Sequence, residues 1–433
     1  GRPRSQVAVD SPIIPPHVRD PRRGLGADQS FASPEQLGIE KGILLLHMLE
    51  ATVGADVLSR ALRDYLAAHP HGTVHTADLS RAIATATSEP IAATLEHYLH
   101  AGTHSLAATL RCTRTERRIE ITEIEQSALV CVAYDHDGKR DDRCARLGDG
   151  TTTIELPAKR CPRWFWPRAV ERVEIEQRAL ESLRDRGWPA LSADEQLAAI
   201  DEVFGHDPTK GRLRLSFIAR AARSDDAAMI SRIASYLANT THLVPPSLRP
   251  KYDAWIGKHF SARARATPVA STDADSRPLM MPLWLVAMDA GDEAVRHDAA
   301  ALLPQLDKLD AVQRWIVQRA AVLDTPSFAD TLLRELPNAS GERSEEIVFA
   351  IAGAPDLLDL LLRHTGDLAA LPSYMKIRLI GQLCDETRRA DVERLAREIT
   401  KEPDRFALRG FEWCIRERKA LEPELRAFLN AKP

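Results

Sequence analysis

The chain has 433 residues, of which 44% are hydrophobic, so it can form several domains with a substantial core and is not a disordered polymer. Its formal net charge of −4 disfavours nucleic acid or an anionic membrane as the main partner. Aromatic residues make up only 5%, and this balance favours helices over sheets. No apolar run reaches about 18 residues, so we expect no transmembrane helix.

The first 30 residues are rich in Pro, Arg and Asp and predict an irregular lead-in. They contain neither an initiator Met nor the apolar core of a signal peptide. We therefore interpret the chain as a fragment or a processed product of a longer protein.

Four helical patterns follow. Ser33 is placed as the N-cap of the first helix, Pro34 at its first position and Gln36 as the partner in a capping box. This helix is expected to run to Val53 and to end at Gly54. Residues 55–69, 76–87 and 89–102 also have apolar residues at helical spacing.

The pattern changes to short strands between residues 106 and 167. Asp137-Gly138 is a two-residue hairpin signal. A loop of these two residues places Cys131 opposite Cys144 in a non-hydrogen-bonded pair, whose Cα separation of roughly 4.5 Å suits a disulfide. A longer loop would shift this register.

The chain has six cysteines, and four of them lie between residues 112 and 161: Cys112, Cys131, Cys144, Cys161, Cys384 and Cys414. No CxxC or zinc-ribbon spacing is present, so an even cluster favours disulfides. If Cys131 pairs with Cys144, Cys112 pairs with Cys161 by exclusion. We expect an oxidising compartment, meaning a secreted, periplasmic or cell-surface protein. Buried free thiols are the alternative, and the state of Cys384 and Cys414 stays open.

Residues 171–433 return to helical periodicity, in segments of about 10 to 18 residues separated by short polar or Pro/Gly breaks. No repeat of fixed length is visible, but paired helices of this length predict an irregular α-superhelix of the HEAT or armadillo kind.

The order of these parts resembles the aminopeptidase N family of zinc-dependent gluzincin aminopeptidases. The family pattern has a Tyr-x-Lys-Gly helix start, a second helix of the form G…F…L..Y and a helix cap of the form T..D. A helix that ends in Trp-Leu and a Gly-Tyr-Pro-like strand entry follow. The matching positions here are Glu40, Lys41, Gly42, Gly54, Leu62, Tyr65, Thr76, Asp78, Tyr98, Leu99 and Gly102. The segment "CPRWFWP" (161–167) resembles the end of the family's β-sandwich, and residues 406–429 resemble its last helices.

The resemblance implies a mainly α protein in three parts. Residues 1–104 are the remaining helical part of a thermolysin-like catalytic domain. Residues 105–170 are a small β-sandwich, and residues 171–433 are the C-terminal α-superhelix.

The sequence departs from the family where catalysis takes place. The family binds zinc with HExxH and a downstream Glu, and the Glu of HExxH activates water. None of the fourteen histidines here is followed by Glu, and the Gly-x-Met-Glu-Asn segment that reads the substrate's amino terminus is absent. The family's transition-state-stabilising Tyr falls at Ile39, which has no hydrogen-bond donor for an oxyanion.

We therefore assign no catalytic residue and no metal ligand to this chain. The histidines of "HPHGTVH" (69–75) are interpreted as a solvated turn. The first hypothesis is the C-terminal part of a zinc aminopeptidase-like protein, inactive alone, whose zinc lies in an upstream half. Its partners would be that half or a peptide substrate.

A non-catalytic pseudopeptidase that binds a peptide or protein on its superhelix is the alternative. A helical solenoid unrelated to peptidases is the third hypothesis.

Overall fold

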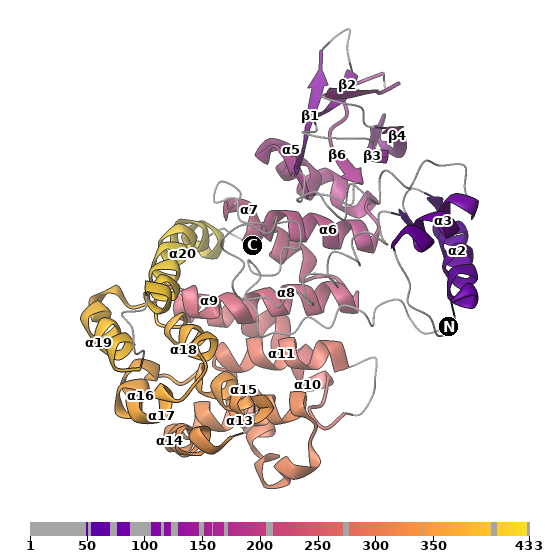
Figure 1. The fold of residues 1–433 in the computed structure, drawn as a ribbon. Coiled ribbons are helices and arrows are strands. Elements are labelled where there is room, and N and C mark those ends of the chain that lie inside the picture. Colours follow the sequence, from indigo (N-terminus) through magenta and orange to yellow (C-terminus); the bar gives the residue numbers. More distant parts are fainter. Residues whose placement is uncertain are drawn as a thin grey trace. The chain divides into compact units, whose positions relative to one another are not determined.

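The computed structural model describes residues 49–50, 53–69, 76–86, 105–113, 117–122, 129–146, 151–157, 159–168, 172–204, 211–271, 277–339, 341–399 and 405–430 (Figure 1). These residues divide into two compact units, one with the described residues up to Phe204 and one with those from Gly211 onward. The fold is mainly α-helical with a small β part, which confirms the predicted fold class.

The first unit begins with two helices that pack against each other, α2 (Ala55–Ala68) and α3 (Thr76–Ala86). Gly54 precedes α2 with a φ of 86°, a left-handed conformation that glycine adopts without steric cost. Its N–H donates to the carbonyl of Glu50 at 2.9 Å. The predicted helix end at Gly54 is therefore where the chain turns.

Two small sheets form the β part. A four-stranded sheet has the order β5-β2-β1-β7, and a three-stranded sheet has the order β4-β3-β6. All pairs are antiparallel except β1 with β7. The strands are β1 (Ser105–Cys112), β2 (Arg117–Thr122), β3 (Leu129–His136), β4 (Lys139–Arg146), β5 (Thr151–Glu155), β6 (Phe165–Arg168) and β7 (Arg172–Ile175).

The β3–β4 hairpin turns at Asp137 and Gly138, whose φ values are 52° and 94°. Positive φ at both positions is the requirement of the two-residue turn that the sequence predicts. The register pairs His136 with Lys139 and therefore Cys131 with Cys144.

Strand β7 corrects the expectation that helical structure begins at about residue 171. Val173 and Ile175 alternate with polar neighbours, and the strand pairs in parallel with β1. The helical segments begin only afterwards, with α5 (Gln177–Ser182), the π turn η3 (Leu183–Gly187), the 3₁₀ turn η4 (Trp188–Ala190) and α6 (Ala193–Phe204).

The described residues of the second unit form helices joined by turns and short irregular segments, with no strand among them. Its helices are α7 (Gly211–Ala221), α8 (Ala227–Thr240), α9 (Arg249–Ile256), α10 (Ala262–Ala266), α11 (Arg277–Asp289), α12 (Glu293–Ala300), α13 (Ala311–Asp324), α14 (Pro326–Glu335), α15 (Gly341–Ile351), α16 (Leu357–Arg363), α17 (Thr365–Ala369), α18 (Ser373–Ile380), α19 (Arg389–Ile399) and α20 (Arg405–Asn430). Short turns between them are η6 (Thr241–Leu243), η7 (Gly257–Ser261), η8 (Leu303–Lys308), η9 (Leu336–Asn338) and η10 (Glu386–Arg388).

Aspartates start several of these helices. Asp226 accepts from the N–H of Met229 at 2.8 Å to start α8. Asp310 and Gln313 form a reciprocal capping box at the start of α13. Each cap satisfies a backbone N–H that has no partner within the helix, which fixes where the helix begins.

A chain of helix contacts runs through the second unit. Helix α8 packs on α11, α11 on α13, α13 on α15, α15 on α18, and α18 on α20. Helix α20, drawn in yellow in Figure 1, also packs against α7, the first helix of the unit. The last helix of the chain therefore closes the unit onto its beginning.

Side chains of α20 make this closure specific. Three pairs link it to α7 and α9: Glu424 with the N–H of Leu215 at 2.8 Å, Asn430 with Lys251 at 2.8 Å, and the ring of Phe428 with that of Trp255 at 5.3 Å. In the part of the chain that the structure describes, no helix combines the length and apolarity needed to cross a membrane.

Candidate functional site

The residues that the sequence places at the family's catalytic Tyr motif are Ile39, Glu40, Lys41 and Gly42. All four lie outside the residues that the structure describes. Tyr98, Leu99 and Gly102 lie outside them as well. The described part of this segment is the α2–α3 pair with the residues directly before α2.

The α2–α3 pair has its own small apolar core. Leu49, Leu58, Ala61 and Ile83 are buried together. Across the pair, charged side chains stay on the outside, as in the ion pair of Arg81 with Asp78 at 3.1 Å in α3. This is an amphipathic arrangement in which the apolar stripe of each helix covers the other.

The polar groups of the β3–β4 hairpin are paired with one another. The hydroxyl of Tyr134 donates to Asp141 at 2.8 Å, and Nδ1 of His136 lies 3.1 Å from the same carboxylate. Because these side chains bind one another, we assign them a structural role, which is to stabilise the β3–β4 hairpin.

Asp135 fastens this hairpin to the segment that leads into β6. The buried carboxylate accepts from the N–H of Gly138 at 2.8 Å and from Nε of Arg163 at 2.7 Å. Burial alone would raise the pKa of Asp135, but the hydrogen bonds from Arg163 and Gly138 hold the pKa below its usual value.

Two disulfides are described in full. Cys112 at the end of β1 is joined to Cys161 before β6, with a Cα–Cα distance of 5.8 Å. Cys384 after α18 is joined to Cys414 in α20, with a Cα–Cα distance of 5.3 Å. Cys131 is also disulfide-bonded, and the backbone register places it opposite Cys144.

The residues of this chain do not fit the family's catalytic zinc. That site needs two histidines one helical turn apart with a Glu between them. No histidine in the sequence is followed by Glu, so this chain does not supply the zinc ligands or the catalytic base of that motif.

One metal-capable group does occur among the described residues, in the second unit. One ligand atom each of His242, Cys384 and Cys414 lie within 4.8 Å of one another. Cys384 and Cys414 are buried, and His242 is half-buried. The sequence alone left these two cysteines open and did not single out His242, since the three residues come from three distant segments.

Electrostatics keep the His242 ring neutral. Burial, together with the charges of Arg418 and Arg319, lowers the pKa of His242 to about 3. Burial also lowers the pKa of Arg418, whose guanidinium donates to the carbonyls of Cys384 at 2.7 Å and His242 at 2.6 Å.

Comparison with known proteins identifies part of the chain by sequence. Residues 28–98 match the model of the peptidase family M1 domain. This segment contains the Ile39-Glu40-Lys41-Gly42 motif and the α2–α3 pair. No curated protein matches the sequence.

Solved structures show the fold. The crystal structure of Legionella pneumophila aminopeptidase A in complex with aspartic acid is similar, with a TM-score of 0.52 over 91% of this chain and 10% sequence identity. The matched region spans 56% of the Legionella chain. At this identity the match shows a shared fold, and the chain spans little more than half of that protein's length.

Residues 28–98 are therefore similar in sequence to the peptidase family M1 domain, and the chain shares its fold with a solved aminopeptidase.

Proposed function

We propose that this chain is the C-terminal, non-catalytic part of a zinc aminopeptidase-like protein that removes residues from the amino terminus of peptides. The observation that carries the proposal is the M1 match at residues 28–98 in a sequence without HExxH. The chain's 56% coverage of an aminopeptidase with the same fold supports it.

The chain would line part of an active site whose zinc ligands belong to an upstream part of the longer protein. The helices of the M1 segment would lie behind the zinc, as the family resemblance implies, and the α-superhelix would restrict access of peptides. Hydrolysis by the family mechanism needs a metal-bound water and an oxyanion donor, and this sequence supplies neither.

The division into residues 1–104, 105–170 and 171–433 is part of this proposal. The β part and the helices after β7 fit it in order, with helical structure starting at Gln177.

The test is hydrolysis of an aminoacyl fluorophore by this chain and by a longer product of the same gene. We expect turnover from the longer protein and none from this chain. Turnover by this chain alone that survives purification to homogeneity would overturn the proposal.

A second candidate function follows from Ile39. An isoleucine at the Tyr position cannot stabilise an oxyanion, so a protein that also lacks the zinc ligands would act as a scaffold. The helical second unit would then bind a peptide or protein.

Replacing Ile39 by Tyr in the longer protein measures how much this position limits catalysis. Because the loss of one oxyanion donor costs on the order of 100- to 1000-fold in turnover, Ile39→Tyr should raise kcat by a substantial part of that factor. Ile39→Phe is the matched control, since it adds the ring without the hydroxyl. Equal turnover in both variants would show that Ile39 does not occupy the Tyr position.

The disulfides indicate an oxidising environment, since such bonds persist outside the reducing cytosol. We propose a secreted, periplasmic or cell-surface location for the protein.

A further inference from the structure

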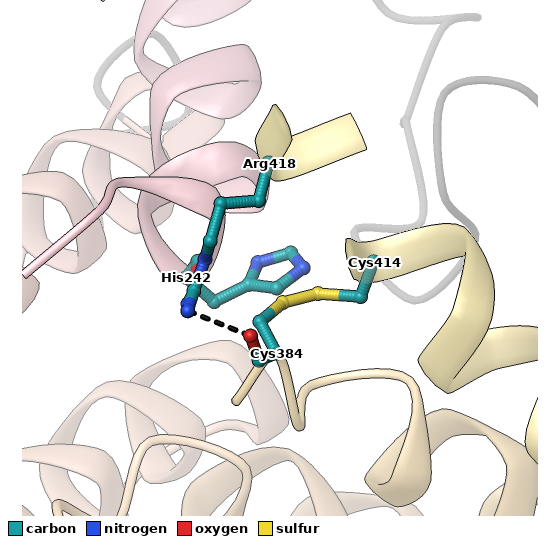
Figure 2. The surroundings of a disulfide bond; sticks show 4 residues. All are labelled: His242, Cys384, Cys414 and Arg418. Atoms are coloured by element: carbon teal, nitrogen blue, oxygen red, sulfur yellow. Dashed lines mark hydrogen bonds between the residues drawn. A yellow bond between two sulfur atoms is a disulfide. The ribbon is translucent and has the colours of Figure 1, made fainter. Parts of the chain in front are cut away.

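The closure of the second unit brings three distant segments to one point. His242 lies in η6, Cys384 follows α18, and Cys414 lies in α20. Figure 2 shows the imidazole ring of His242 beside the disulfide that joins the two cysteines. The three ligand atoms lie within 4.8 Å of one another.

One ring nitrogen of His242 lacks a hydrogen bond, and the neighbouring disulfide does not explain why. Nε2 of His242 is buried and has no hydrogen-bond partner. Buried polar atoms are nearly always paired, and one without a partner calls for an explanation such as an absent ion.

The other ring nitrogen sets the form of the imidazole. The ring makes a hydrogen bond with the backbone of Asn239. Since Nε2 has no partner, this bond uses Nδ1–H and leaves a bare lone pair on Nε2. A backbone carbonyl that fixes the tautomer in this way is the usual second partner of a metal-binding histidine.

Arg418 holds the ligand-bearing segments together. Its guanidinium donates to the backbone carbonyl of Cys384 (Figure 2). It also donates to the backbone carbonyl of His242, which comes from a different segment. Two thiolates with one Zn²⁺ carry no net charge, so a site beside this cation is not repelled by it.

We propose that His242, Cys384 and Cys414 form a redox-gated zinc site, closed as a disulfide in the oxidised protein and able to bind Zn²⁺ once the disulfide is reduced. Two sulfurs and one imidazole nitrogen are ligands that zinc prefers. Ligands at 2.0–2.3 Å from zinc are roughly 3.5–4 Å apart, so opening the S–S bond gives the sulfurs the separation that the metal needs.

The chemistry balances with a dithiol as reductant. A thiolate of the dithiol attacks one sulfur, the Cys384–Cys414 bond breaks, and the dithiol leaves as its own cyclic disulfide. The two cysteine thiols then bind Zn²⁺ as thiolates and release two protons, while Nε2 of His242 supplies its lone pair. Three protein ligands leave the fourth position to water or a further ligand.

The first experiment uses the full chain. The protein is reduced with a phosphine, and the phosphine is then removed under anaerobic conditions. The reduced protein is titrated with Co²⁺ as a spectroscopic substitute for Zn²⁺. We expect a sulfur-to-cobalt charge-transfer band in the reduced chain and none in the oxidised chain. A reduced chain without this band would overturn the proposal.

Substitutions show which residues bind the Co²⁺ ion that gives the charge-transfer band. Cys384→Ser should abolish it, and His242→Gln should weaken Co²⁺ binding at least about tenfold. His364→Gln is the matched control, since His364 is occupied by Asp330 and Asp367. The double change Cys112→Ser and Cys161→Ser should leave the band intact. A band that persists in Cys384→Ser would place the metal elsewhere and contradict the proposal.

A second measurement needs no substitution. Zn²⁺ added to the reduced chain should slow alkylation of Cys384 and Cys414, read by peptide mass spectrometry, and leave Cys112 and Cys161 unprotected. Equal alkylation of all four with and without Zn²⁺ would refute the site. The proposal does not rest on peptidase activity, so its failure and that of the proposed function are separate results.

Discussion

At the residue scale, Glu424 is a buried acid in the closing helix α20. Its side chain is 4% exposed, and Oε1 accepts from the N–H of Leu215 while Oε2 has no partner. Burial raises the pKa of Glu424 to about 7, against the smaller lowering effects of that hydrogen bond and of Arg214.

This raised pKa predicts that stability falls as pH rises. Between its ordinary value of 4.5 and about 7, the unfolded chain has lost the proton of Glu424 and the folded chain keeps it. The folded state binds more protons there, so the contribution of about 3 kcal/mol is complete below pH 4.5 and is lost as pH rises through 7.

Glu424→Gln should remove this dependence, because the amide stays neutral at every pH. The check is urea unfolding of both proteins between pH 5 and 8, with Glu422→Gln as control, since Glu422 is paired with Arg426 on the same helix. Parallel curves for the wild type and Glu424→Gln would contradict the pKa assignment.

Single residues were predictable where the backbone is locally constrained. Gly54 and the Asp137-Gly138 turn have positive φ, and the sequence marks both. Glu424 and His242 were not predictable, because the groups they meet lie far away in the chain, as Leu215 lies from Glu424.

At the element scale, the Cys112–Cys161 bond ties strand β1 to the segment before β6. It closes a loop of 49 residues, which removes about 4 kcal/mol of conformational freedom from the unfolded chain. The β part should depend on this bond, because its two sheets are small.

Replacing both Cys112 and Cys161 by Ser should therefore lower the free energy of unfolding of the first unit by about 4 kcal/mol. Hydrogen exchange of the strand amides measures the loss in that unit. Thr153→Ser, an exposed change on β5, serves as control. Exchange rates in β1 and β2 equal to those of the wild type would show that the bond contributes nothing.

The elements themselves followed from periodicity in most places. The strands β1 to β6 lie in the predicted strand region, and α11 lies in the predicted helical region, with Met280, Val286 and Met288 buried. Strand β7 was missed because four residues carry little periodicity. Its partner β1 lies more than 60 residues earlier, and no local pattern reveals a parallel pair.

At the scale of the whole chain, the order of helices, β part and helices was predictable from the resemblance to aminopeptidase N. The closure of the second unit by α20 was not, since α20 packs on α7 through contacts between distant segments. The candidate catalytic motif at Ile39 stays a prediction, because it lies outside the described residues.

The proposal that this chain is the non-catalytic part of an M1 aminopeptidase-like protein can be tested by its zinc content. Elemental analysis, under non-reducing conditions, would compare this chain with a longer product of the same gene. We predict no zinc in this chain and about one zinc in the longer protein, together with aminopeptidase activity there. Stoichiometric zinc with aminopeptidase activity in this chain alone would contradict the proposal.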